Sequence, residues 1–207
     1  MKILVACEYS GRVRDAIRIA DVNREHHVVS ADLLPCESPN PGFHYQGDAL
    51  DLAYGEHWDM MIAHPPCTYL SNSGVSWLHR KEGRWEKLDE GAEFFKHLLD
   101  APIERICIEN PIPHKYAVQR IGRKYDQLVQ PYHFGHPERK ATCFWLKGLP
   151  HLKPTNDVQE EMLQLPKSEA QRLHWLPPSV ERAKLRSLTY QGIADAIAMQ
   201  YTQGGTR

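Results

Sequence analysis

The sequence lacks several features that would assign it to a specialised class of protein. No eighteen consecutive residues are apolar, so no segment is typical of a membrane-spanning helix. The N-terminal MKILVACEYSG lacks the basic start, apolar middle and small-residue cleavage site of a signal peptide, which predicts a cytoplasmic protein. Neither sign of charge dominates, since 25 Lys and Arg residues stand against 26 Asp and Glu residues. This balance excludes a general coat for nucleic acid, which needs a strong positive field.

The sequence also lacks close cysteine pairs. The five cysteines stand singly: Cys7, Cys36, Cys67, Cys107 and Cys143. This scatter argues against a disulfide framework or a zinc ribbon and favours reduced thiols. Two short spacings, His64 to Cys67 and His133 to His136, are compatible with zinc ligands. Because two prolines separate His64 from Cys67 and no second tight pair follows, we predict no metal site.

The remaining composition is that of one folded domain. The chain has 207 residues, 42% of them hydrophobic, which is enough for a single packed core over residues 1–207. Short apolar runs alternate with segments of helical spacing. The predicted strands are Lys2–Cys7, His27–Ala31, Phe43–Gly47, Trp58–Ala63 and Glu104–Ile108, and the predicted helices are Arg12–Ala20 and Leu88–Leu99. This alternation predicts an α/β fold with a Rossmann-like, doubly wound, mostly parallel sheet.

The last third of the chain has a different pattern. Two further strands, Gln127–His133 and Ala141–Leu146, flank a polar turn. The stretch Leu149–Pro178 is broken by prolines and is predicted to be irregular. A final helix, Tyr190–Tyr201, carries an apolar face that would pack against the sheet.

Polar residues follow five consecutive predicted strands. These segments are Glu8–Gly11, Asp32, Asp48, Pro65–Cys67 and Glu109–Pro111. Ligands of open parallel sheets bind at the carboxyl ends of the strands, so the clustering predicts a functional site there. Four of these segments have a structural alternative: a tight turn and helix cap for Ser10–Gly11, a surface carboxylate for Asp32, an inert buried thiol for Cys67, and a cap or ion pair for Glu109.

Four segments, taken in order, resemble one known family. They are AHPPCTYLSNSG, IENP, GHPERKATCFWLKGLP and LTYQGIADAIAMQYT. They look like the nucleophile loop, the Glu-Asn segment, the arginine-bearing strand pair and the final helix of the cytosine carbon-5 DNA methyltransferases. The resemblance is stronger still to short, phage-type members. It implies the class I S-adenosylmethionine-dependent methyltransferase version of the predicted fold.

The resemblance implies a chemistry for the strand-end residues. Carbon 5 of cytosine is a poor nucleophile, so a thiolate first adds to carbon 6, and a proton or hydrogen bond at nitrogen 3 assists. Cys67 would be that nucleophile, and Glu109 would serve nitrogen 3 and the exocyclic amine. Arg139, together with Lys140, would stabilise charge on the base oxygen. The resemblance also assigns substrate contacts to Thr68, Asn110 and Lys140.

The resemblance further implies S-adenosyl-L-methionine as the cofactor. Ser10 and Gly11 would lie beneath its methionine part, and Asp32 would bind the ribose hydroxyls. Asp48 would lie near the adenine amine, and Pro65 beside the sulfonium.

The region that would recognise the substrate is short. Family members that modify DNA carry a large target-recognition region before the final helix, whereas here residues 149–188 form only a short irregular insertion. Flipping a base out of a duplex costs a few kcal/mol, which strand contacts normally offset. Three substrates therefore remain open: DNA read with the help of a protein partner, single-stranded DNA, or a free cytosine nucleotide.

One alternative belongs to another functional class. A methyltransferase fold can keep its pocket and serve as a non-catalytic binding module. The presence of both Cys67 and Glu109 favours the enzyme.

Overall fold

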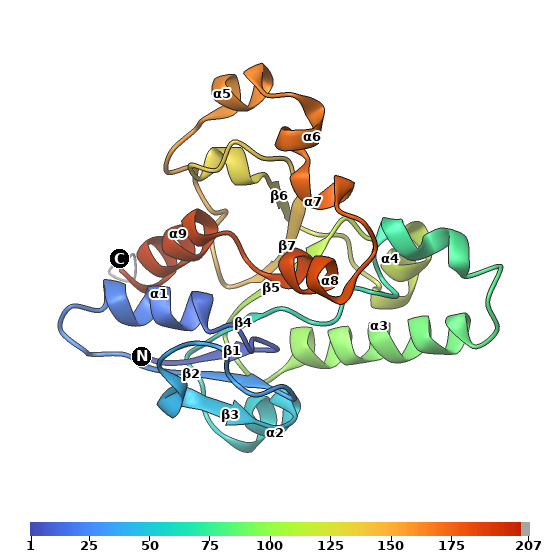
Figure 1. Ribbon diagram of the computed structural model, residues 1–207. Helices are drawn as coiled ribbons and strands as arrows, with labels where there is room; N and C mark the ends of the chain where they lie inside the picture. The colour runs from blue at the N-terminus through green and yellow to red at the C-terminus, as the bar shows by residue number, and fades with distance from the viewer. Residues whose placement is uncertain (204–207) are drawn as a thin grey trace.

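Seven strands form one central sheet in the computed structural model, which describes residues 1–203 (Figure 1). The strands are β1 (Lys2–Ala6), β2 (His27–Asp32), β3 (His44–Gln46), β4 (Met60–Ala63), β5 (Arg105–Pro111), β6 (Gln127–Val129) and β7 (Thr142–Lys147). The central strands β1 and β4 are short apolar runs whose residues are buried nearly throughout. Such runs are typical of strands covered on both faces.

The strand order identifies the fold. It reads β3-β2-β1-β4-β5-β7-β6, with β1 to β5 parallel and β7 antiparallel to both β5 and β6. The order 3-2-1-4-5 is that of a doubly wound Rossmann-like sheet. The predicted α/β fold with a mostly parallel sheet is therefore confirmed.

Helices cover both faces of this sheet. One face is covered by α1 (Arg12–Ala20) and α9 (Gln191–Thr202), which lie side by side in Figure 1. The other face is covered by α2 (Ala49–Gly55), α3 (Arg84–Asp100) and α4 (Lys115–Ile121). Along β1, Ile3 and Val5 join the first hydrophobic cluster, whereas Leu4 and Ala6 join the second. This alternation follows from the two-residue period of a strand.

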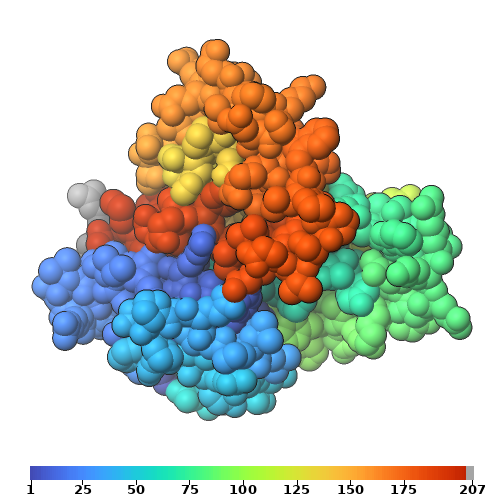
Figure 2. Space-filling view, in the orientation of Figure 1, coloured from blue at the N-terminus to red at the C-terminus, as the bar shows by residue number. Residues whose placement is uncertain are grey.

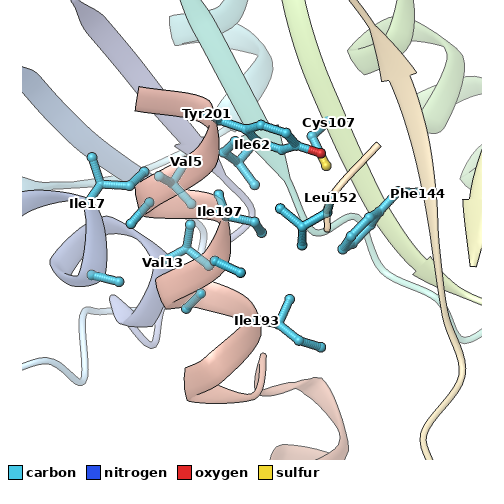
Figure 3. Packing of buried hydrophobic residues seen from close by; sticks show 14 of the residues in the cluster. Val5, Val13, Ile17, Ile62, Cys107, Phe144, Leu152, Ile193, Ile197 and Tyr201 are labelled. Atoms are coloured by element: carbon cyan, nitrogen blue, oxygen red, sulfur yellow. The ribbon is translucent and has the colours of Figure 1, made fainter. Parts of the chain in front are cut away.

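The last helix joins the first hydrophobic cluster. Ile193, Ile197 and Tyr201, spaced by four residues, point from α9 toward the sheet in Figure 3. At its start, Gly192 lies so close to β6–β7 that an added Cβ would stand 1.9 Å from the carbonyl oxygen of Phe134. Only glycine permits this approach of two backbones.

The region between β7 and α9 differs from its prediction. Instead of an irregular stretch it contains four short helices, α5 (Gln159–Gln164), α6 (Lys167–Ala170), α7 (Arg172–Trp175) and α8 (Val180–Ser187). In Figure 2 the orange-red part of this region lies across the face between the blue N-terminal part and the teal segment. Residues 149–188 thus form a small layer of short helices beside the sheet.

Several predicted boundaries were wrong. The strand predicted at Gln127–His133 ends at Val129, because Pro131 has no N–H for the ladder and starts the 3-10 helix η3 (Pro131–His133). Helices α2 and α4 were missed, as were the 3-10 helices η1 (Pro41–Phe43) and η2 (Asn72–Trp77). The predicted single domain runs to residue 207, and its residues 204–207 lie outside the described part. Within residues 1–203, no helix has the length and apolar character needed to cross a membrane.

Candidate active site

The loop after β1 is built around a buried carboxylate. Cys7 ends the strand with a φ of 57°, a left-handed conformation that costs free energy in a residue other than glycine. The turn directs Glu8 inward, where its two oxygens accept the N–H groups of Val13 and Arg14 at 2.6 and 3.2 Å. Glu8 thus caps the first turn of α1. Burial raises the pKa of Glu8, whereas the charge of His64 and these two hydrogen bonds oppose that rise.

Beyond β4, the chain brings His64 beside Glu109. The backbone N–H of His64 donates to the oxygen of Ala6, which continues the parallel ladder past the last strand residue. Because Ala63 pairs with Ile108 in β5, the next residues, His64 and Glu109, become neighbours. The His64 Nδ1 and Glu109 Oε2 atoms lie 2.8 Å apart, with both side chains about nine-tenths buried. The two side chains form a buried hydrogen bond, which is an ion pair when His64 is protonated.

The pair shifts the pKa of both partners. Burial alone would raise the pKa of Glu109, but its hydrogen bond to His64 and the charges of His64 and Lys140 hold the pKa below its usual range. Burial opposes protonation of His64, yet its bond to Glu109 and the charges of Glu109 and Glu8 raise its pKa. Glu109 is therefore favoured as a carboxylate and His64 as a cation.

Cys67 lies on the turn that follows two prolines after β4. Its carbonyl oxygen accepts the N–H groups of Leu70 and Ser71, which fixes the turn. Burial and then the charge of Glu109 raise the pKa of the Cys67 thiol, whereas Lys140 and Arg186 act in the opposite direction. The thiol is therefore protonated at rest.

The turn before β7 carries two adjacent cations, Arg139 and Lys140, which have different surroundings. Lys140 is turned into the site, where its Nζ donates to the carbonyl oxygen of Leu188 at 3.1 Å. Burial lowers the pKa of Lys140, and the charges of Glu109 and Cys67 oppose this shift. Arg139 is exposed and directs its Nε toward Met162 Sδ at 3.2 Å. The structure therefore brings Lys140, and not Arg139, together with Cys67 and Glu109.

A pocket of about 230 Å³ opens beside these residues. It is lined by Cys7, Glu8, Tyr9, Ser10, Asp32, Leu34, His64, Pro66, Ser187, Leu188 and Thr189. Ser10 and Asp32, two of the residues assigned to a cofactor, thus face a common space. Asp32 accepts the N–H of Leu34 through one oxygen at 2.9 Å.

The other three residues assigned to a cofactor are not among those that line this pocket. Gly11 has a φ of 71° and is the N-cap of α1, and an added Cβ would meet Ser38 at 2.7 Å. Asp48 is exposed and caps α2 through the N–H of Leu50, although its charge reaches Cys7. Pro65 is buried between His64 and Cys67. Gly11 thus has the helix-cap position that was the structural alternative for its segment, and Asp48 is a helix cap as well.

Two further residues were assigned to the substrate: Thr68, which directly follows Cys67, and Asn110, which directly follows Glu109. Thr68 is exposed on the turn, and Gly74 approaches its carbonyl oxygen closely. Asn110 is buried and donates from Nδ2 to the oxygen of Pro65 at 3.2 Å, which ties β5 to the Cys67 loop. In this structure Asn110 supports the loop.

The segment from Lys184 to Tyr190 closes one side of the pocket. Ser187 Oγ lies 2.9 Å from the hydroxyl of Tyr9, and the oxygen of Thr189 accepts from Arg12 at 2.8 Å. Lys184 and Glu37 form an ion pair at 2.8 Å. Sequence reasoning missed this wall because its contacts join residues more than 140 positions apart along the chain.

Sequence reasoning also missed the role of His64. The residue was considered only as a metal ligand, but it hydrogen-bonds to Glu109. Its position three residues before Cys67, at the end of an apolar strand, was the available signal. Within residues 1–203, no three His, Cys, Asp or Glu side chains gather as a metal-binding group.

Comparisons with known proteins find a likeness to solved structures in fold alone. No family model matches the chain, and no curated protein matches it. One similar structure is a chain assigned as a DNA modification methyltransferase encoded within an E. coli prophage, with 14% identity, a TM-score of 0.47, and coverage of 80% of this chain and 55% of that one. Another is the Entamoeba histolytica methyltransferase EhMeth, with 17% identity, a TM-score of 0.48, and coverage of 76% and 57%. The chain thus spans little more than half the length of either protein.

Proposed function

We propose that this protein transfers a methyl group from S-adenosyl-L-methionine to carbon 5 of cytosine in DNA, through a covalent adduct of Cys67. One observation carries the proposal: a half-buried thiol, a carboxylate and a lysine lie close enough to shift one another's pKa at the strand ends of a Rossmann-like sheet, beside a pocket. The resemblance of the Pro-Pro-Cys and Glu-Asn segments supports the same chemistry.

Cys67 and Glu109 each perform one part of the activation of the cytosine base. The Sγ atom of Cys67 bonds to carbon 6 of cytosine, which places electron density on carbon 5. Glu109 donates a proton at nitrogen 3, so that the ring does not become an anion. Lys140 lies close enough to both groups to affect their pKa, and it stabilises negative charge during the addition.

The resting protonation states provide the proton for this step. The free protein favours a neutral Cys67 thiol and an ionised Glu109 carboxylate. A net shift of the proton from Cys67 to Glu109 upon substrate binding yields the thiolate nucleophile and the neutral acid together. After transfer, nitrogen 3 returns its proton to Glu109 and solvent water takes the proton of carbon 5. The electrons of that C–H bond form the double bond between carbons 5 and 6, and the bond between carbon 6 and Sγ breaks with its electron pair on sulfur.

The side chains that line the pocket include the kinds of polar group that bind a nucleoside-bearing cofactor. Ser10 and Asp32 provide hydroxyl and carboxylate oxygens, and the buried Nε2 of His64 has no hydrogen-bond partner among residues 1–203. Ser10 and Gly11 would bind the methionine part, Asp32 the ribose, Asp48 the adenine amine and Pro65 the region of the sulfonium. When bound, S-adenosyl-L-methionine supplies an electrophilic methyl group.

A second candidate keeps the chemistry and changes the substrate. Residues 149–188 form four short helices of four to eight residues, a small surface for reading a duplex. A single-stranded or free cytosine nucleotide needs no base flipping and so fewer strand contacts. Target recognition by a protein partner is the alternative that keeps duplex DNA as the substrate.

Transfer of labelled methyl groups tests the function. Purified protein is incubated with methyl-labelled S-adenosyl-L-methionine and, in parallel, duplex DNA, single-stranded DNA and deoxycytidine monophosphate. We expect label on carbon 5 of cytosine in at least one substrate, and none with Cys67→Ser. Cys36→Ser is the matched control, because Cys36 lies outside the pocket lining and should keep full activity. Cofactor binding without transfer to any substrate would favour a binding module instead.

A further inference from the structure

His64 connects the two halves of the site. Its Nδ1 atom bonds to Glu109 at 2.8 Å, while its ring lines the pocket that also contains Glu8, Ser10 and Asp32. The side chain is only 9% exposed. The same ring therefore reaches the reacting carboxylate on one side and the pocket on the other.

The second nitrogen of this ring has no partner. Among the described residues 1–203, His64 Nε2 is fully buried and makes no hydrogen bond. Glu8 also lines the pocket and its charge acts on His64, but both of its oxygens already accept N–H groups of α1. A buried polar atom without a partner costs free energy, which a bound molecule recovers when it supplies one.

We propose that His64 is a binding residue for the molecule in the pocket, to which Nε2–H donates, and a positioning residue for Glu109, which Nδ1–H holds. The proposal rests on the proposed function, because it takes S-adenosylmethionine or its product as that molecule. It follows that binding in the pocket and the orientation of Glu109 depend on one imidazolium ring.

The charge of the ring follows from its neighbours. Glu109 on β5 and Glu8 after β1 favour the cation, whereas Lys140 before β7 opposes it. A protonated ring donates from both nitrogens, whereas a neutral ring that donates to Glu109 offers only a lone pair at Nε2. Binding of an acceptor oxygen at Nε2 should therefore favour the protonated ring and weaken as pH rises.

The test measures binding of S-adenosylhomocysteine by calorimetry across a series of pH values. In wild-type protein we expect affinity to fall as pH rises through the raised pKa of His64. His64→Asn keeps an amide donor near the Nδ1 position but removes Nε2 and the charge. We expect this variant to bind about tenfold more weakly at mildly acidic pH, and with no comparable pH dependence. His57→Asn, which changes a histidine whose side chain is 84% exposed, is the matched control and should behave as wild type.

The outcomes separate this inference from the proposed function. Wild-type affinity and pH dependence in folded His64→Asn would overturn the role of His64 and leave the function standing. Failure of wild-type protein to bind S-adenosylhomocysteine would overturn both. The expected pH profile, combined with no methyl transfer to any cytosine substrate, would support His64 as a ligand residue and refute the enzyme. Thermal unfolding of each variant establishes that it is folded.

Discussion

Two buried carboxylates at the ends of strands on either side of β4 behave in opposite ways. Glu8, after β1, has a raised pKa, whereas Glu109, in β5, has a lowered one. Backbone N–H groups hold Glu8, and side chains that carry charge surround Glu109. Since His64 follows β4 between them, its charge favours ionisation of both. The difference shows that burial alone does not decide the direction of a carboxyl group's pKa shift.

The groups that surround Glu8 and Glu109 differ in whether they can change their protonation. The N–H groups of Val13 and Arg14 belong to a helix and cannot change their protonation, so Glu8 is suited to fixing the loop. The partners of Glu109 include His64, which titrates, and Lys140, whose pKa is lowered. Glu109 therefore lies among groups that can exchange a proton, as acid–base catalysis requires.

The largest expected effect is a difference in methyl-transfer rate between variants of Glu109 and of Glu8. Glu109→Gln should lower the rate of methyl transfer by roughly 10²- to 10⁴-fold, because an amide cannot take up and deliver the proton. Glu8→Gln keeps an oxygen for the helix cap and should lower the rate far less. Steady-state rates of label incorporation, with binding of S-adenosylhomocysteine as a check on the pocket, measure the difference. Equal losses in both variants would show that Glu109 has no special chemical role.

A smaller effect should distinguish Lys140 from Arg139. Lys140→Met removes the half-buried cation that acts on Cys67 and Glu109, and we expect a loss of activity on the order of 10²-fold. Arg139→Met changes an exposed side chain and should alter the rate by only a few fold. Lys140→Arg, which keeps the charge, should recover part of the activity. A greater loss in Arg139→Met than in Lys140→Met would instead support the arginine assigned by resemblance.

The comparison also explains what the sequence could predict. The apolar runs predicted β1, β4 and β5, because a strand buried on both faces needs continuous apolar residues. Helix α2 was missed because its seven residues are too few for a clear periodicity. Turn geometry around residue 140 decides which cation points inward, and no spacing rule reveals that choice. The partnership of His64 with Glu109 required the register between β4 and β5, which only the assembled sheet defines.

The smallest expected effect concerns stability and pH. A raised pKa in the folded state means that Glu8 contributes stability below the pKa of an unfolded glutamate, and that this contribution is lost as pH rises through the folded pKa. The lowered pKa of Glu109 has the opposite consequence. Its contribution is present above the unfolded pKa and is lost as pH falls through the folded pKa.

Urea unfolding of wild type, Glu8→Gln and Glu109→Gln over a pH series measures both contributions. The free energy of unfolding of wild type minus that of Glu8→Gln should decrease with rising pH, and the difference for Glu109→Gln should increase, each by on the order of 1 kcal/mol. Slopes of the same sign would mean that the two carboxylates have similar surroundings. Opposite slopes would confirm that burial dominates the pKa of Glu8, whereas the hydrogen bond and charges of its neighbours dominate the pKa of Glu109.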